Sequence, residues 1–110
     1  SLHTDSCIHR SGYKAAHRLP SRLPEAEGRL VNCIDEHYAS ITGLVADPDT
    51  VTPNMTEYHA YRKINPATPA AILEMGFLGT DQELIMQHSD LVADAIVERI
   101  LCFLEGEDAL

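Results

Sequence analysis

A short apolar run, Ala70-Ala71-Ile72-Leu73, is bounded by turn signals on both sides. The segment 65–69 precedes it and contains two prolines, and Glu74-Met75-Gly76 follows it. A brief apolar run between turns is typical of a buried strand in an α/β sheet. Helical patterns occur before and after this run, so the predicted elements alternate strand, helix, strand, helix. This order favours an α/β fold over an all-α or all-β fold.

The segment from Pro24 to Thr42 has the pattern of an amphipathic helix. Proline is tolerated in the first turn, and the acids Glu25 and Glu27 suit the positive end of the helix dipole there. Glycine at position 43 predicts the end of the helix. The apolar side chains that recur at helical spacing are Leu30, Ile34, Tyr38 and Ile41.

Two more helices are predicted near the C-terminus. Thr80 is expected to cap a short helix that runs through Met86, with Glu83 at the capping-box position. The last helix is expected over residues 91–104, with a cap at Ser89 or Asp90. Residues 105–110 are expected to form a polar tail that frays. The apolar stripe of the last helix comprises Val92, Ile96, Ile100 and Phe103.

The first 24 residues are polar, and Gly12, Pro20 and Pro24 interrupt them. This pattern predicts a strand end followed by a long loop.

The chain has 110 residues, a length that suits one domain rather than two. We therefore interpret residues 1–110 as a single domain.

The charge balance of the chain is acidic, with 8 Lys and Arg against 17 Asp and Glu and a formal net charge of −9. Nucleic acid is therefore not an expected partner, because binding to phosphates requires a basic surface and the sequence has no run of Lys or Arg. No stretch approaches 18 consecutive apolar residues, so no membrane span is predicted.

Three cysteines, Cys7, Cys33 and Cys102, are widely spaced and form no C-x-x-C pair. Cys33 and Cys102 lie among apolar residues and are interpreted most simply as small core residues. One disulfide with one free thiol is the alternative. A metal cluster of Cys7, His9 and His3 would have a spacing that matches no standard zinc finger.

Two residues stand out as candidates for chemistry. Glu74 directly follows the apolar run 70–73, and ligands bind at the carboxyl ends of strands in open α/β sheets. Apolar neighbours would raise the pKa of its carboxyl, which suits a general base. Alternatively, Glu74 caps a backbone N–H or forms an ion pair. His3 is either a metal ligand at a strand end or a hydrogen-bonded surface histidine.

Other candidates have simpler explanations. His59 lies between Tyr58 and Tyr61 and is interpreted as part of a packed aromatic cluster rather than a pocket wall. Arg62 and Lys63 are interpreted as a solvated pair rather than a binding site for an anionic substrate group. The motifs of serine hydrolases, dinucleotide-binding proteins and P-loop proteins are absent from the sequence.

Glu74 belongs to a longer pattern, Thr68-Pro69-Ala70-Ala71-Ile72-Leu73-Glu74-Met75-Gly76-Phe77-Leu78-Gly79-Thr80-Asp81. This segment resembles the signature of the zinc-dependent N-acetylmuramoyl-L-alanine amidases of the type-3 family. That signature has a proline, apolar residues, Glu-x-Gly-Phe, an apolar residue, a small residue, Asn and a nearby acid. Ser1-Leu2-His3-Thr4-Asp5-Ser6 is similar to the family's Ser-apolar-His-Ala-Asn segment. The end of the last helix is similar too, so the resemblance covers nearly the whole chain.

The resemblance implies a twisted mixed sheet flanked by helices, of which this chain holds the C-terminal portion. It also implies that His3 binds Zn²⁺ and that Glu74 is the catalytic general base or acid. In the family mechanism, zinc lowers the pKa of its bound water and the glutamate takes the proton. The amide between N-acetylmuramic acid and L-alanine of peptidoglycan is then hydrolysed. The implied partner is peptidoglycan or a muropeptide, and the implied location is the cell envelope.

The chain also departs from the family pattern. Asp5 and Thr80 each replace an asparagine of the family. A His and a Glu that complete the family's zinc site precede the Ser-apolar-His segment, so they have no counterpart here. We therefore expect a missing N-terminal segment or self-association to complete the sheet. Two other functions remain open, a non-catalytic cell-wall or protein-binding module and a metallohydrolase acting on a different amide.

Overall fold

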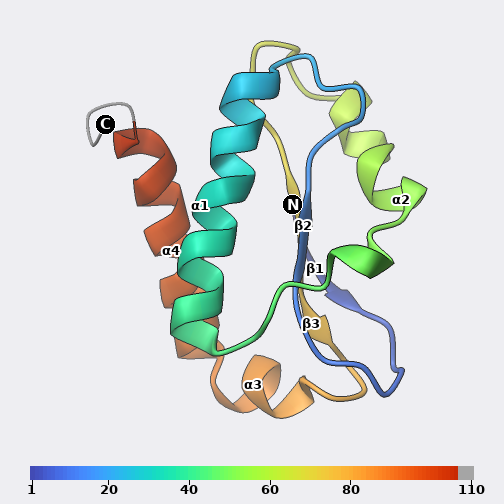
Figure 1. Ribbon diagram of the computed structural model, residues 1–110, viewed down its shortest axis with the longest axis vertical. Coiled ribbons are helices and arrows are strands. Elements are labelled where there is room, and N and C mark those ends of the chain that lie inside the picture. The colour runs from blue at the N-terminus through green and yellow to red at the C-terminus, as the bar shows by residue number, and fades with distance from the viewer. Residues whose placement is uncertain (107–110) are drawn as a thin grey trace.

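The computed structural model describes residues 1–106 and has a three-stranded sheet with helices on both faces (Figure 1). This arrangement confirms the predicted α/β fold with a mixed sheet flanked by helices. The strands are β1 (Leu2–Asp5), β2 (Lys14–Ala16) and β3 (Ile72–Phe77). The α-helices are α1 (Pro24–Thr42), α2 (Pro53–Thr56), α3 (Gln82–Gln87) and α4 (Ser89–Glu105). Two 3₁₀ helices are η1 (Pro48–Thr50) and η2 (His59–Arg62).

The central strand of the sheet is β3, and the strand order is β1-β3-β2. β1 runs parallel to β3, with His3 opposite Glu74. The register then shifts, so that Asp5 lies opposite Phe77. β2 runs antiparallel to β3 and places Lys14 opposite Glu74 from the other side. Glu74 therefore has a polar neighbour on each flanking strand.

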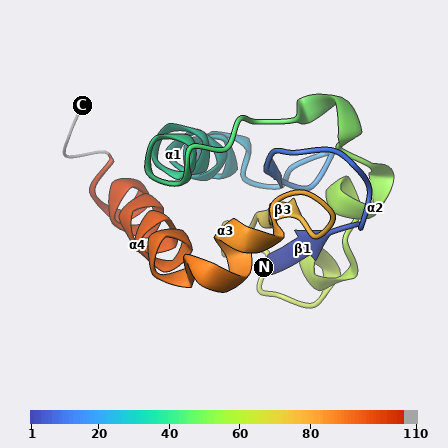
Figure 2. The same cartoon turned by 90° about the horizontal axis from the view of Figure 1, so that it is seen from below.

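The two faces of the sheet are covered differently. α1 and α4 pack against one face, and α2 lies on the other side of the strands (Figures 1 and 2). Successive side chains of a strand point to opposite faces, so Leu73 enters the main core while Ile72 and Glu74 face α2. The buried members of the main core are Tyr13, Ile34, Tyr38, Leu73, Val92 and Ala95. A smaller cluster beneath α2 comprises Ala16, Met55 and Ile72.

Helix α1 begins and ends where the sequence predicts. Pro24 occupies its first turn, and Gly43 ends it in the left-handed conformation with φ of 77°. The Gly43 N–H donates a hydrogen bond to the Ala39 carbonyl, which satisfies one of the last carbonyls of the helix. Ile34 and Tyr38 are buried at helical spacing, and the Tyr38 hydroxyl donates a 2.6 Å hydrogen bond to the Met75 carbonyl of β3.

Helix α4 packs along α1, but its buried face differs from the predicted stripe. Val92 is buried as expected, whereas Ile100 is 45% exposed. The buried positions that follow Val92 are Ala95 and Arg99. The small side chain of Ala95 permits close packing, and hydrophobicity alone cannot identify Arg99 as a buried residue. The helix extends through Glu105, which was predicted to belong to the frayed tail, and residues 107–110 lie outside the described part of the chain.

Three local predictions are wrong. The predicted loop after β1 contains β2, because Lys14–Ala16 completes the antiparallel side of the sheet. Glu74 lies inside a strand rather than after it, because pairing on both sides extends β3 to Phe77. Thr80 does not cap α3; Asp81 stands at that position and makes no side-chain cap hydrogen bond.

The Asp81 carboxylate instead joins three segments of the chain. It is buried and accepts hydrogen bonds from the Phe77 N–H (2.9 Å), the Gly12 N–H (3.1 Å) and the Ser11 hydroxyl (2.5 Å). Gly76 allows this approach, since a Cβ at that position would lie 3.0 Å from the Cβ of Asp81. The Glu-x-Gly-Phe segment and the acid that follows it therefore hold the end of β3 against the loop before β2.

Replacing Asp81 by asparagine is expected to lower the free energy of unfolding by about 1–3 kcal/mol. An asparagine keeps one acceptor oxygen and has no charge, so the bonds from the Phe77 and Gly12 N–H groups lose their charged acceptor and the Ser11 hydroxyl can no longer donate to the side chain. Urea denaturation would measure the change. The matched control is Asp94→Asn on the exposed side of α4, which should change the stability by less than about 0.5 kcal/mol. Equal stabilities of the two variants would contradict this role of Asp81.

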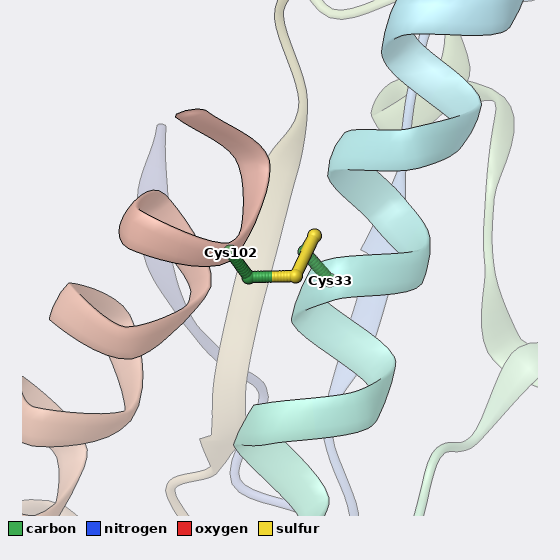
Figure 3. The surroundings of a disulfide bond; sticks show 2 residues. All are labelled: Cys33 and Cys102. Atoms are coloured by element: carbon green, nitrogen blue, oxygen red, sulfur yellow. A yellow bond between two sulfur atoms is a disulfide. The ribbon is translucent and has the colours of Figure 1, made fainter. Parts of the chain in front are cut away.

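A disulfide joins the two long helices. Cys33 of α1 is bonded to Cys102 of α4, with their Cα atoms 5.8 Å apart (Figure 3). The simplest interpretation of these cysteines as unpaired core residues is therefore wrong, and the alternative of one disulfide with one free thiol is confirmed. Cys7 is the free and exposed cysteine. The 69-residue separation of the paired cysteines explains why no local pattern predicts the bond.

Candidate functional site

The sheet register brings the two sequence-predicted site residues together. His3 and Glu74 are paired across β1 and β3, so both side chains emerge on the face of the sheet that looks toward α2. They line an open hollow of about 270 Å³ together with Asp5 and Lys14. The opposite wall comes from the segment around α2 and comprises Thr52, Asn54, Met55 and Tyr58.

Glu74 is a half-buried carboxylate with charged neighbours. Burial raises the pKa of the Glu74 carboxyl above its usual range. The negative charge of Asp5 raises this pKa further, and the positive charge of Lys14 acts against the rise. The Oε2 atom of Glu74 is buried and has no hydrogen-bond partner among the described residues. A buried oxygen without a protein partner, at the edge of a hollow, favours a bound water or ligand at this position.

His3 is held by two neighbours. Its Nε2 atom lies 2.7 Å from the Ser1 hydroxyl. Its ring meets Tyr58 edge-on, with the ring centroids 5.1 Å apart. Tyr58 also contacts the rings of His59 and Tyr61, which confirms the packed aromatic cluster predicted from the sequence. This cluster therefore supports the imidazole of His3.

Sequence reasoning did not identify the ion pair beside Glu74. The Lys14 ammonium lies 2.5 Å from Oδ2 of Asp5 and also donates a 2.9 Å hydrogen bond to the Thr50 carbonyl. It stands over the Phe77 ring, 5.3 Å from the centroid. The local signal for a strand is weak here, because two alanines follow Lys14 and alanine is depleted in strands. The lysine bridges β2 to β1 across the central strand and brings a positive charge to the rim of the hollow.

The raised pKa of Glu74 predicts a pH dependence of stability. The folded state holds the proton of Glu74 more tightly than the unfolded state, so ionisation of this group opposes folding. The wild-type protein should lose stability relative to Glu74→Gln as the pH rises from about 4.3, the usual glutamate value, through the raised pKa. Urea unfolding of both proteins across this range would measure the difference, and a difference that stays constant with pH would contradict the prediction.

The donor set fits a zinc site only in part. His3 offers an imidazole to the hollow, while the nearby Asp5 carboxylate is paired with Lys14. A catalytic zinc ion takes three protein ligands and leaves one position open. Within residues 1–106, no group of three metal-ligating side chains that includes His3 comes together. For the same reason, Cys7, His9 and His3 do not form the metal cluster that was considered from their spacing in the sequence.

A second hollow adjoins the first at Tyr58. It has a volume of about 430 Å³, and Arg18 and Arg62 contribute to its wall. The side chain of Arg62 is exposed, which agrees with its interpretation as a solvated residue. It also donates a hydrogen bond to the Glu57 carbonyl, at 3.4 Å. Two guanidinium groups against the carboxylate of Glu57, which also lines this hollow, give this side of the site a net positive charge.

The fold and the site together define an α/β domain whose sheet presents a histidine and a half-buried glutamate in one hollow. The sequence matches no protein-family model, and a search of curated proteins finds no match. Solved structures of the same fold do exist. One is the catalytic domain of CwlV, an N-acetylmuramoyl-L-alanine amidase from Bacillus (Paenibacillus) polymyxa var. colistinus, with a TM-score of 0.64 and 21% identity.

A second similar structure is an N-acetylmuramoyl-L-alanine amidase from Clostridium difficile 630, with a TM-score of 0.68 and 21% identity. In both comparisons 94% of this chain is covered, and it spans 55% of the other chain, about half its length. The chain therefore has the fold of these amidases over part of their structure. No helix within residues 1–106 is long and apolar enough to cross a membrane.

Proposed function

We propose that this chain is the C-terminal part of the catalytic domain of a zinc-dependent amidase that acts on peptidoglycan. The reaction is hydrolysis of the amide between N-acetylmuramic acid and L-alanine. The observation that carries the proposal is the pairing of His3 with Glu74 in one hollow, where the buried Oε2 atom of Glu74 has no protein partner. The amidase fold of the neighbouring structures supports it. A protein with this function would work in the cell envelope.

In this proposal Glu74 moves the proton. A carboxylate with a raised pKa can take a proton from the attacking water and return it to the leaving amine of L-alanine. Lys14 and Asp5 set the charge beside it. His3 is the zinc ligand that this chain supplies, oriented by Ser1 and Tyr58. Zinc, when bound, supplies Lewis-acid chemistry at the amide carbonyl, and its other ligands would come from outside residues 1–106.

The positive hollow beside Tyr58 fits the substrate class. The stem peptide of peptidoglycan carries free carboxylates, and Arg18 and Arg62 line that hollow. Guanidinium groups bind carboxylates through paired hydrogen bonds. The arginines would then hold the peptide while the amide lies over Glu74.

A non-catalytic binding module is the second candidate. The observation that favours it is the single histidine in the hollow, since one ligand is too few for a catalytic zinc site. Such a module would keep the hollow and the arginines for binding muropeptides. A metallohydrolase that acts on a different amide would use the same residues, and comparing substrates with and without the muramyl sugar separates it from the first proposal.

The zinc content of the purified chain tests the proposal. We expect about one zinc ion per chain when the segment that provides the other ligands is present, after dialysis against zinc-containing and then zinc-free buffer, measured by elemental mass spectrometry. His3→Ala should lose this zinc, whereas the matched variant His88→Ala, at an exposed position before α4, should keep it. Release of L-alanine-terminated peptides from purified peptidoglycan would then measure activity.

Two results would contradict the proposed enzyme. One is a folded chain that binds no zinc and cleaves no peptidoglycan, even when it is supplied in trans with the segment that provides the other ligands. The other is zinc bound equally by wild type and His3→Ala. A chain that sediments with peptidoglycan but never cleaves it would favour the binding module.

A further inference from the structure

A second group of metal-ligating side chains lies between α1 and α4, on the other side of the sheet from the hollow of His3 and Glu74. The ligand atoms of Glu36, His37 and Cys102 all lie within 4.8 Å of one another. Cys33 belongs to the same place, because its sulfur is bonded to that of Cys102 (Figure 3). All four residues line one cavity of about 560 Å³.

The helix geometry explains why these groups converge. Positions 33, 36 and 37 are three and four residues apart, so Cys33, Glu36 and His37 share one face of α1. This face looks toward the last turns of α4, where Cys102 lies with its Cα 5.8 Å from that of Cys33. Two helices packed in this way can present four ligands to one ion, as the metal sites of helical bundles do.

The oxidation state of the cysteines decides what this group can bind. The sulfur ligand of a metal is the thiolate, and a disulfide has none. In the oxidised protein the group therefore offers only the imidazole of His37 and the carboxylate of Glu36. Two electrons and two protons convert the disulfide into two thiols, with a dithiol as the reductant. Binding of a divalent metal then releases both thiol protons.

We propose that reduction of the Cys33–Cys102 disulfide creates a Zn²⁺ site formed by Cys33, Cys102, His37 and Glu36. Two thiolates, an imidazole and a carboxylate are a donor set of the kind that binds zinc tetrahedrally. The link between α1 and α4 would then exist in two forms, a disulfide under oxidising conditions and a metal bridge under reducing ones. This site shares no residue with the proposed amidase site, so either proposal can fail alone.

The charge around the cavity favours a cation. Glu98 and Glu105 of α4 line it in addition to Glu36. Arg29 also lines it, and its guanidinium is stacked over the Phe103 ring, 5.2 Å from the centroid. Three carboxylates against one arginine give the cavity a negative balance, which attracts divalent ions.

Cobalt binding tests the proposal, because Co²⁺ substitutes for zinc and reports its ligands by absorption. The experiment uses the Cys7→Ser variant, so that Cys33 and Cys102 are the only cysteines present. It is compared in the oxidised form and after reduction with a phosphine, which avoids competing thiols in the buffer. We expect an intense near-ultraviolet thiolate-to-cobalt band and visible tetrahedral bands in the reduced form alone. Zn²⁺ should displace the cobalt and remove both.

Variants then identify the ligands. His37→Ala and Glu36→Gln should each weaken cobalt binding by at least about 10-fold, in line with the loss of groups that support a metal site. The matched control His88→Ala should bind cobalt as well as the parent protein. His3→Ala should also leave the thiolate band unchanged, which separates this result from any failure of the proposed amidase site.

Three results would overturn the proposal. The first is a reduced protein, folded by circular dichroism, that gives no thiolate-to-cobalt band. The second is a thiolate-to-cobalt band that is as strong in His37→Ala and Glu36→Gln as in the control His88→Ala. The two thiolates would then bind the metal without the proposed imidazole and carboxylate. The third concerns a chain that unfolds when the disulfide is reduced. In that case the proposal fails if added metal does not restore the helical signal and the thiolate-to-cobalt band together.

Discussion

Replacing Glu74 by glutamine is expected to lower the rate of peptidoglycan amide hydrolysis by about 10²–10⁴-fold, the usual contribution of a general acid–base group. Glutamine has nearly the same shape but cannot take a proton from water. The fold should survive, because the buried Oε2 atom of Glu74 has no hydrogen bond to lose. The measurement is kcat/KM for release of L-alanine-terminated peptides from a muropeptide, with zinc and any segment that supplies the missing ligands present.

The matched control for this experiment is Glu83→Gln, at an exposed position in α3. It removes the same charge at a residue that does not line the hollow and should leave kcat/KM within about 2-fold of wild type. Equal rates for Glu74→Gln and wild type would contradict the role of Glu74 as the proton carrier.

The wild-type rate should also fall at low pH, with a midpoint above the usual glutamate value, because the base must be ionised and its pKa is raised.

Removing the disulfide is expected to lower the free energy of unfolding by about 4 kcal/mol, as loop-closure entropy gives for a closed loop of this length. The bond joins residues 69 positions apart, so it removes much of the conformational freedom of the unfolded chain. It also holds α4 on α1 at a place where Leu101 and Leu104 of α4 remain exposed. The double variant Cys33→Ala/Cys102→Ala, studied by urea denaturation, would measure the change.

The control for the disulfide is Cys7→Ser, which alters a free and exposed thiol and should change the stability by less than about 0.5 kcal/mol. A loss below about 1 kcal/mol in the double variant would contradict the prediction and would mean that the packing of α1 on α4 already restrains the chain. Small domains have about 5–15 kcal/mol of stability in total, so the expected loss should be visible as a large shift of the urea midpoint.

Some parts of the fold could be predicted from the sequence because local interactions determine them. Helix α1 is an example, since Pro24 starts it, Gly43 ends it and the apolar spacing between them repeats every turn. The α/β class followed from the order of short and long apolar patterns. The choice of His3 and Glu74 came from their two sequence segments, and the register of the sheet places them side by side.

The remaining features depend on contacts between distant residues. β2 is three residues long and exists because β3 offers a free edge, so its own sequence carries little signal. Likewise, Arg99 replaces an expected apolar residue on the buried face of α4, which depends on how α4 crosses its neighbours. Local periodicity contains no information about which strands pair or how helices cross.

By itself, then, the sequence determined the α/β class, the long helix α1 and the two residues proposed for chemistry, because propensity, caps and periodicity act over a few residues. The tertiary structure alone decided three further features: the pairing of Cys33 with Cys102, the Lys14–Asp5 ion pair beside Glu74, and the approach of Glu36 and His37 to Cys102. The first and third of these join residues that are far apart in the chain, and the ion pair joins two strands that both lie beside β3. Their distances are set by the packing of helices and the register of strands, which no short segment specifies.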